Sequence, residues 1–475
     1  MKTLDYKGFY WEKFDENQKP INPKECQIVF SPKDGGKLSY FLNIDEEFQY
    51  EDTKDKRIKV LYGQASGGKK FTLYNLKFES ARPHFTANFE LTEVIFSIEY
   101  IFYDGFVDIE KKLPIMHVRY SYLELWFNQL DIKRPHDDEN KTFAGIAVNK
   151  EHLKGSSAEY KVLFNIDNSL NQNSFNNKII TYEATNALAI AKKEDFSIKE
   201  AIDLSLLIKN FFEIVIFYSE NKIFIEEFYI TQKRELKGGL KVDEIVYLLF
   251  KQDDYIEEQK MSHLDFLFRY SDVKENFVEI LNNWIENHDK NKNEYQAFCN
   301  VIADKTSKFN IYSHYFQLIS ALEAYHRLQN KDIEEQEEQK HREYLEGLKI
   351  QLASCSLSSD EKKKVLYKLK YQYGTNFKER LKNLVEISEI KEVILCDDFF
   401  HDKIIEFIYK MRNKVAHLKN EIEVSQQLKS SFEYLKLVAL LIMLKDISLS
   451  HAKIHKNIFD MDIKYIQKRF KNIAK

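Results

Sequence analysis

Three polar residues near the C-terminal end of the sequence, Arg412, Asn413 and His417, combine a group that can move a proton with a group that can bind a phosphate. Histidine titrates near neutral pH and can serve as acid or base. The planar guanidinium of arginine matches phosphate oxygens, and an asparagine amide can orient either partner. Attack by a ribose 2′-hydroxyl on the adjacent phosphate needs both groups, so the trio is a candidate site for RNA cleavage.

The trio is expected on one helix, residues 399–418. At about 100° per residue, its apolar residues form a narrow stripe that would pack against a core: Ile404, Ile408, Met411, Val415 and Leu418. Asn413 and His417 fall on the opposite side of the helix. Arg412 lies roughly 140° around from His417 on an ideal helix. Its side chain must therefore bend, or the helix must distort, for both groups to meet one phosphate.

Three lysines beside the trio, Lys410, Lys414 and Lys419, are predicted to bind the RNA backbone. No carboxylate cluster that could hold a metal ion is evident, and we expect the chemistry to need neither a metal nor a cofactor. The same residue types also suit a solvated helix face. The spacing alone leaves both interpretations open.

A supporting residue is predicted at Glu323, in a helix expected over residues 309–328. It shares one stripe of that helix with Tyr312, Phe316 and Ile319. A carboxylate on an apolar face requires a cationic partner, and we hypothesise that Glu323 holds the guanidinium of Arg412. The alternative is that Glu323 lies at the edge of the stripe and reaches water.

Other polar clusters carry less information. His326 is expected to be a packing or surface residue, and the pair His451 and His455 has the spacing of metal ligands but no evident third ligand. The glycine-containing segments 34–37 and 66–70 lack the full phosphate-loop pattern and are expected to be turns. The cysteines form no C-x-x-C pair, which is typical of a reduced cytosolic protein: Cys26, Cys299, Cys355 and Cys396.

Length and composition predict several globular domains. The chain has 475 residues, of which 44% are hydrophobic, enough for two or three cores. The formal net charge of -4 is nearly neutral, so affinity for RNA must come from a local basic patch. The longest apolar run, Leu437–Leu444, is far below the ~20 residues of a membrane span, and the N-terminal segment lacks a signal-peptide core. We expect a cytoplasmic protein with no membrane partner.

Residues 1–270 are expected to form a β-rich, sandwich-like domain. Runs of aromatic and β-branched residues alternate with turns, and Gly35-Gly36 and Gly67-Gly68 predict hairpins. One helix is expected at Ser197–Val215. The expected strands are Gln27–Ser31, Leu38–Ile44, Ile58–Gly63, Phe71–Phe78, His84–Glu90, Val94–Tyr103, Met116–Phe127, Tyr160–Ile166, Lys178–Glu183, Ile223–Ile230 and Ile245–Phe250.

The remaining sequence has helical periodicity. We expect a helical connector over residues 271–294 and an all-α bundle over 295–475. Helix starts are indicated by capping sequences at Ser358-x-x-Glu361 and Asn376-x-x-Glu379, and the most apolar helix is expected at Phe432–Leu449. The predicted fold class is α+β multidomain, with the β-rich domain followed by the helical bundle.

The stretch Arg412-Asn413-x-x-x-His417 resembles the R-N-x-x-x-H signature of HEPN domains, helical bundles found in many prokaryotic ribonuclease toxins. FQLISALEAYHR (316–327) resembles the early helix of the Apea-type HEPN branch, which is linked to abortive infection against phage. FTLYNL (71–76), FSIEYIF (96–102) and MHVRYSYLELWF (116–127) resemble the ApeA-like N-terminal domain that usually precedes it. The resemblance covers most of the chain, and the C-terminal motif is its most specific part.

The resemblance implies a metal-independent endoribonuclease that leaves a 2′,3′-cyclic phosphate, with tRNA among the candidate substrates. Arg412 would then stabilise the phosphate, His417 would move the proton, and Asn413 would orient them. The resemblance also implies a homodimer through the helical domain, in which one chain can supply its arginine to the histidine of the other. A phage-derived trigger would act at the β-rich domain.

Two other functions stay open on the sequence. HEPN-like bundles also occur as nucleotide- or partner-binding modules that do not cleave, although a pure binder has no need of a titrating residue in the trio. The β-rich half could instead lead a carbohydrate- or protein-recognition function, with the helices as a dimerisation device. No residue of the expected strands identifies a ligand for that function.

Overall fold

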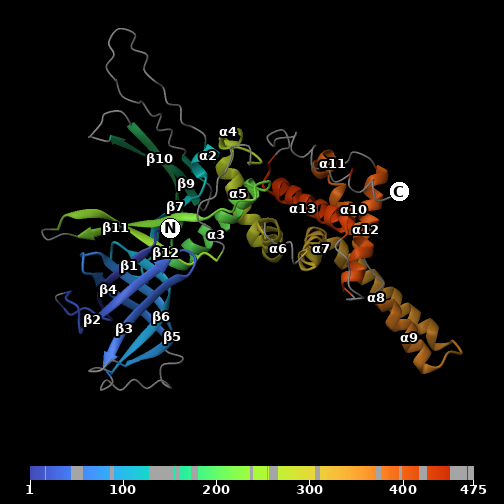
Figure 1. Ribbon diagram of the computed structural model, residues 1–475. Helices are drawn as coiled ribbons and strands as arrows, with labels where there is room; N and C mark the ends of the chain where they lie inside the picture. The colour runs from blue at the N-terminus through green and yellow to red at the C-terminus, as the bar shows by residue number, and fades with distance from the viewer. Residues whose placement is uncertain are drawn as a thin grey trace, which may run out of the picture. The chain divides into compact units, whose positions relative to one another are not determined.

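The computed structural model describes residues 1–16, 18–43, 57–85, 90–127, 154–156, 160–172, 180–235, 239–253, 255, 266–304, 311–370, 376–394, 398–416, 425–449 and 468. The chain divides into two compact units, Met1–Lys274 and Glu275–Lys475 (Figure 1). The first is a large antiparallel sheet with few helices, and the second is helical. The predicted α+β fold class is confirmed.

The described part of the first unit contains one antiparallel sheet of 12 strands. Their order is β3-β2-β1-β4-β5-β6-β12-β11-β7-β10-β9-β8, and β3 also pairs with β6, so that the first six strands form a closed ring. The layers expected of a sandwich are thus parts of one continuous sheet. The strands are β1 (Leu4–Trp11), β2 (Lys24–Ser31), β3 (Gly35–Asn43), β4 (Arg57–Ala65), β5 (Lys70–Phe85), β6 (Glu90–Tyr103), β7 (Leu113–Tyr120), β8 (Lys154–Ser156), β9 (Tyr160–Gln172), β10 (Ile180–Phe196), β11 (Ile225–Glu235) and β12 (Lys241–Phe250).

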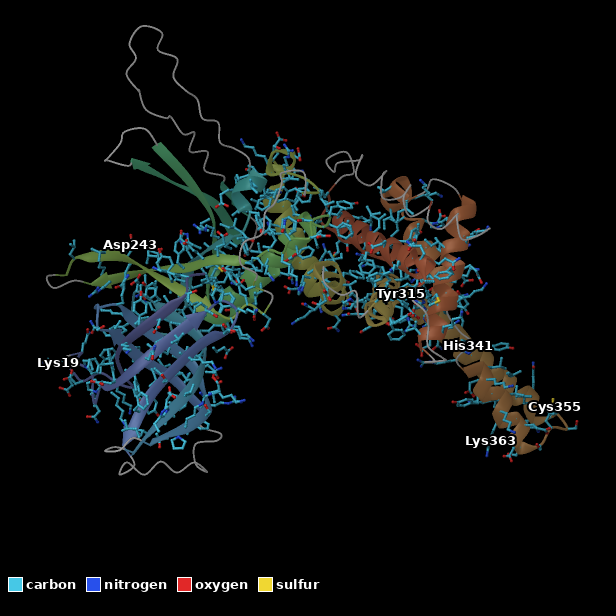
Figure 2. All side chains as sticks on the ribbon, viewed as in Figure 1. Lys19, Asp243, Tyr315, His341, Cys355 and Lys363 are labelled. Carbon is cyan, nitrogen blue, oxygen red and sulfur yellow. The ribbon has the colours of Figure 1, made fainter. Side chains whose placement is uncertain are left out.

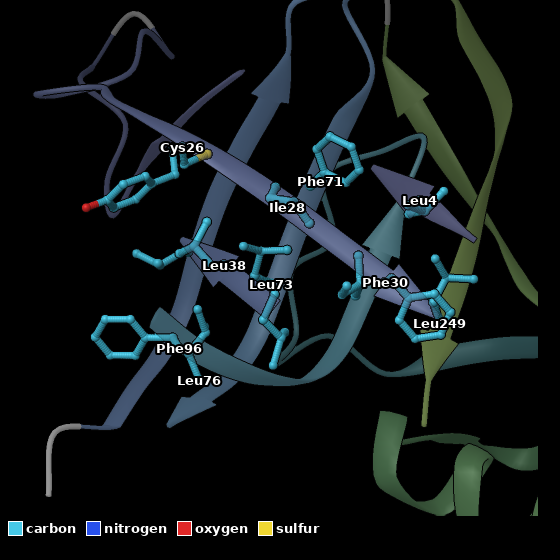
Figure 3. Close-up of a cluster of buried hydrophobic side chains, with 14 of the residues drawn as sticks. Leu4, Cys26, Ile28, Phe30, Leu38, Phe71, Leu73, Leu76, Phe96 and Leu249 are labelled. Atoms are coloured by element: carbon cyan, nitrogen blue, oxygen red, sulfur yellow. The ribbon is translucent and has the colours of Figure 1, made fainter. Parts of the chain in front are cut away.

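One hydrophobic core of this unit fills the interior of the six-stranded ring. Side chains from β1, β2, β3, β5 and β6 meet there (Figure 3), among them the fully buried Phe30, Leu38 and Leu73. Successive side chains of a strand point to opposite faces, so the apolar alternation of the sequence supplies the inward set. Burial of each such side chain contributes roughly 1.5–3 kcal/mol, which makes the ring a stable scaffold.

Two local predictions in this unit need correction. The strand expected over Met116–Phe127 ends at Tyr120, and the chain continues as α2 (Leu123–Phe127). Tyr122 has a positive φ of 63°, which breaks the strand, and the indole of Trp126 donates to the carbonyl of Phe268 at 2.9 Å. The strand β1 was not predicted at all. The helix α3 (Ile198–Val215) begins at the expected position, with Ser197 and Glu200 forming a capping box.

Most helices of the second unit pack around α13 (Gln426–Asp446), whose apolar side chains are almost all buried. The first unit ends with the short helix α4 (Tyr270–Val273). The described helices of the second unit are α5 (Phe277–Lys290), α6 (Lys292–Ala303), α7 (Ile311–Gln329), α8 (Lys331–Ala353), α9 (Ser359–Lys370), α10 (Phe377–Val385), α11 (Ser388–Ile394), α12 (Asp398–Ala416) and α13 (Gln426–Asp446). Both predicted capping sequences are present: Glu361 accepts from the backbone of Ser358, and Asn376 and Glu379 form a capping box.

A carboxylate at the end of α13 ties three helices together. Asp446 accepts hydrogen bonds from the hydroxyls of Tyr295 on α6, at 2.6 Å, and Tyr325 on α7, at 2.8 Å. Its backbone carbonyl accepts from the amide of Asn287 on α5, at 2.9 Å. Buried polar groups are costly unless they are paired, so these contacts fix how α7 lies against α13 and thereby where Glu323 of α7 lies.

Two highly charged helices, α8 and α9, project from the rest of this unit (Figure 2), where His341, Cys355 and Lys363 are labelled. They form an antiparallel pair linked by a contact of 3.0 Å between Nε2 of His341 and the carbonyl of Leu369. Within the residues that the structure describes, no helix has both the length and the apolar character required to cross a bilayer.

Candidate functional site

The helix α12 presents one apolar and one polar side, as its sequence predicts. Ile404, Ile408 and Met411 of the expected stripe are buried, and α12 packs on α7, α10 and α13. Arg412 and Asn413 follow Met411 on the helix and are half-buried, whereas Lys414 is exposed. The packing of the stripe therefore leaves the guanidinium and the amide at the rim of the bundle, where a ligand can reach them.

The contact predicted between Glu323 and Arg412 is present. Nη2 of Arg412 donates to Oε2 of Glu323 at 3.0 Å, and the guanidinium carbon lies 5.5 Å from the ring centroid of Phe377 on α10. The side chain of Arg412 is 33% exposed and that of Glu323 is 16% exposed. A guanidinium carries five N–H groups, so this contact and the ring stacking hold the group while other N–H groups remain for a phosphate.

Glu323 also binds a second arginine, Arg327, one turn further along α7. Nη2 of Arg327 donates to Oε1 of Glu323 at 2.8 Å, and the Arg327 side chain is 55% exposed. Each oxygen of one carboxylate thus holds a different guanidinium, which brings two positive groups from two helices together. Sequence analysis did not predict this role of Arg327, although the i,i+4 spacing of Glu323 and Arg327 is visible in the sequence.

A third arginine, Arg380 of α10, is buried beside this cluster. It forms an ion pair with Glu334 of α8, and its Nη1 lies 3.4 Å from Nδ1 of His326. The other ring nitrogen of His326 lies 3.4 Å from the amide of Asn383. Burial and the neighbouring arginines lower the pKa of His326, so the ring is neutral at neutral pH. The expectation that His326 is a packing or surface residue agrees with its burial in this interior position.

The predicted RNA-binding lysines have different surroundings. Lys410 is 67% exposed and forms an ion pair with Glu406 at 3.4 Å, while Glu406 also pairs with Lys378 of α10. Lys414 is exposed. Ion pairs this exposed are weak, so Lys410 can exchange Glu406 for a phosphate at little cost.

Several predicted residues lie outside the described part of the chain. His417 and Lys419 of the candidate site belong to this group, as do Leu418 of the apolar stripe and the pair His451 and His455. The described segment of α12 ends at Ala416, immediately before His417 in the sequence. The structure therefore places Arg412, Asn413, Glu323 and two of the three lysines, and leaves the position of the imidazole as a prediction.

Two family models match the sequence. The model described as ApeA N-terminal domain 1 matches residues 5–284, and the model described as Apea-like HEPN matches residues 316–453. The second match contains the Glu323–Arg412 pair as well as Asn413 and His417. No curated protein matched the chain.

Proposed function

Because this chain belongs to the Apea-type HEPN family and carries the ApeA N-terminal domain, we propose that its helical unit is a metal-independent endoribonuclease. HEPN domains generally act on RNA and dimerise. One observation carries the proposal for this chain: the guanidinium of Arg412 is held by Glu323 at the rim of the bundle, five residues before the only histidine of the motif. Phosphodiester cleavage requires a fixed, partly exposed cation and a titratable group, and the motif supplies one of each.

In the proposed reaction, His417 accepts the proton of a ribose 2′-hydroxyl, and the 2′-oxygen attacks the adjacent phosphorus. The bond from phosphorus to the 5′-oxygen of the next nucleotide breaks, and that oxygen receives a proton from the protonated imidazole. The products are a 2′,3′-cyclic phosphate and a 5′-hydroxyl. Arg412 pairs with the non-bridging oxygens, whose negative charge grows in the transition state, and Asn413 orients the reacting groups.

Positive side chains around the trio would hold the RNA backbone. We assign Lys410, Lys414 and Lys419 to this role, and we add Arg327, which is more exposed than Arg412 and shares its carboxylate. Each phosphate contact releases counterions, so binding should weaken as salt increases. A local cluster of this kind supplies the attraction that the nearly neutral chain as a whole does not.

We further propose that the active form is a homodimer through the helical unit. On one ideal helix Arg412 and His417 point roughly 140° apart. In a dimer, Arg412 of one chain could instead meet His417 of the other. In cells, the enzyme would act in abortive infection against phage, with the β-rich unit as the part that receives a phage-derived trigger. tRNA is a candidate substrate.

RNA ends sequenced after brief expression would test the activity and the substrate together. Wild-type protein is expected to produce new 2′,3′-cyclic phosphate ends, and a His417→Ala protein of equal abundance is expected to produce none. Equal toxicity of the two proteins, or a dimer that binds RNA but yields no such ends, would instead favour a binding protein that does not cleave.

A further inference from the structure

The first unit contains an open cavity of about 680 Å³ that has no role in the proposed cleavage. Its lining comes from β4, β5, β6 and α3, from the turn between β2 and β3, and from the end of β12 and the residues after it. Cavities of roughly 300–1,000 Å³ suit small organic ligands. Every lining residue belongs to the first unit.

The cavity forms where β5 and β6 exchange their inward and outward faces. Leu73 and Leu76 on β5 lie three positions apart, and both are fully buried. Ile98 and Ile101 on β6 have the same spacing and are only 5% and 1% exposed. Strict alternation would place one of each pair outside. Between them Asn75 has a positive φ of 55°, a conformation that asparagine tolerates. This irregularity turns polar side chains towards the cavity.

The carboxylates that line the cavity already have partners. The three groups and their contacts are Asp34 with the hydroxyl of Ser31 at 2.7 Å, Asp253 with Lys251 at 2.7 Å, and Glu99 with the amide of Asn75. Only Asp253 has a cationic partner, whereas Asp34 and Glu99 accept from neutral groups. The lining as a whole holds four cations and three carboxylates and is therefore slightly positive.

Three cations in the lining, Arg57, Lys77 and Lys209, form no ion pair with any carboxylate of the described residues. Arg57 and Lys77 lie directly opposite each other on β4 and β5. Like charges at such positions destabilise a sheet, and Lys209 adds a third charge from α3. An anion with several negative oxygens would remove this repulsion.

The lining also contains aromatic and apolar side chains. The half-buried Tyr100 lies with its ring centroid 6.5 Å from that of Phe250, and Leu206 of α3 remains 37% exposed. A planar ring placed here would cover apolar surface that now faces water. Cations and exposed apolar surface in one cavity match a ligand that joins a flat ring to several phosphates.

We propose that this cavity binds a phosphorylated nucleoside, with its phosphates at Arg57, Lys77 and Lys209 and its base against Tyr100 and Leu206. The proposal goes beyond the proposed cleavage and does not depend on it. It gives the β-rich unit a small-molecule site of defined chemistry.

Calorimetric titration of the full-length protein with AMP, ADP, ATP, GTP and inorganic tripolyphosphate, in EDTA, tests the proposal. Nucleoside di- and triphosphates are expected to bind, and Lys77→Ala or Lys209→Ala to weaken them by about tenfold each, the value of one charge-assisted contact. The matched control is Lys37→Ala, because Lys37 lies on neighbouring β3 with its charge paired to Glu79 at 2.8 Å, outside the lining.

Three outcomes would overturn the proposal. One is that none of these nucleotides binds the protein with an unchanged cavity, and another is that the Lys37 variant loses as much affinity as the Lys77 variant. The third is that tripolyphosphate binds as tightly as ATP, which would leave the base without a site. Single-stranded RNA that competes for the cavity while nucleotides do not would assign it to a polynucleotide instead. A His417→Ala protein serves in every titration, so the result is independent of cleavage.

Discussion

Replacement of Glu323 by glutamine tests how the candidate cation is held. The glutamine keeps the shape of the side chain and one acceptor oxygen but removes the charge that both Arg412 and Arg327 contact, at 3.0 and 2.8 Å. Arg412 would then retain the Phe377 ring and one neutral acceptor. We expect its guanidinium to sample several orientations, and the two arginines to repel each other without a shared counter-charge.

The magnitude follows from the exposure of the pair. Exposed ion pairs contribute about 0–1 kcal/mol, and removal of one partner of a fully buried pair costs about 3–5 kcal/mol. At 16% and 33% exposure of the two side chains, we expect an intermediate cost of about 1–2 kcal/mol. Since each 1.4 kcal/mol of lost transition-state stabilisation is about a factor of ten in rate, kcat/KM of Glu323→Gln should fall roughly tenfold.

The assay is cleavage of a fluorescent RNA by purified protein, with thermal unfolding measured in parallel. Because Arg412 is assigned to the charge that develops in the transition state, kcat should fall more than KM rises. Glu346→Gln is the control, since Glu346 forms an exposed ion pair with Lys349 on α8, away from the candidate site. A Glu323→Gln protein with wild-type kcat/KM and wild-type stability would refute the reasoning.

Three further predictions concern the same helices. Arg380→Met should lower the free energy of unfolding in urea by about 2–4 kcal/mol, because it leaves Glu334 without its partner. Burial first, and then Arg380, lower the pKa of His326 below 6.5, so at acidic pH the unfolded chain binds a proton that the folded chain does not. The free energy of unfolding of the wild-type protein should therefore fall as the pH drops from about 6.5 to about 5. The fall should be smaller in His326→Asn. Mixing Arg412→Ala with His417→Ala chains should restore about a quarter of wild-type activity if each site takes these residues from different chains, and none if one chain supplies both.

Local signals in the sequence predicted two helix starts of the second unit, whereas the helix expected over Phe432–Leu449 spans Gln426–Asp446. The capping sequences before residues 359 and 377 fix helix starts through bonds within one turn, and the starts lie there. The Glu323–Arg412 contact, which is present, was a hypothesis with a solvent-exposed Glu323 as its alternative, since a carboxylate on an apolar stripe requires a cation. The stripe itself is only partly buried, because Phe316 is 42% exposed. The helix starts needed no knowledge of distant parts of the chain, whereas Glu323 and its partner Arg412 lie 89 positions apart.

Features that depend on distant chain segments were not predictable. The closure of the ring joins Gly36 to Ile98, and no local pattern encodes such a pairing. The strand β1 was missed because Gly8 interrupts its strand pattern. Glycine is required at this position, since a Cβ would lie 2.1 Å from the carbonyl oxygen of Gln64 on β4. The burial of Arg380 depends on α8 supplying Glu334, so nothing in the sequence of α10 distinguishes it from a surface arginine.

The measurement that tests the central claim most directly uses a short RNA with a single cleavage position and the same RNA with a 2′-deoxy sugar at that position. In EDTA, the wild-type protein is predicted to cut the first to a 2′,3′-cyclic phosphate and to leave the second intact, while His417→Ala and Arg412→Ala cut the first at least about 100-fold more slowly. Cleavage of the deoxy-substituted RNA at the same position, or wild-type rates in either variant, would contradict the account.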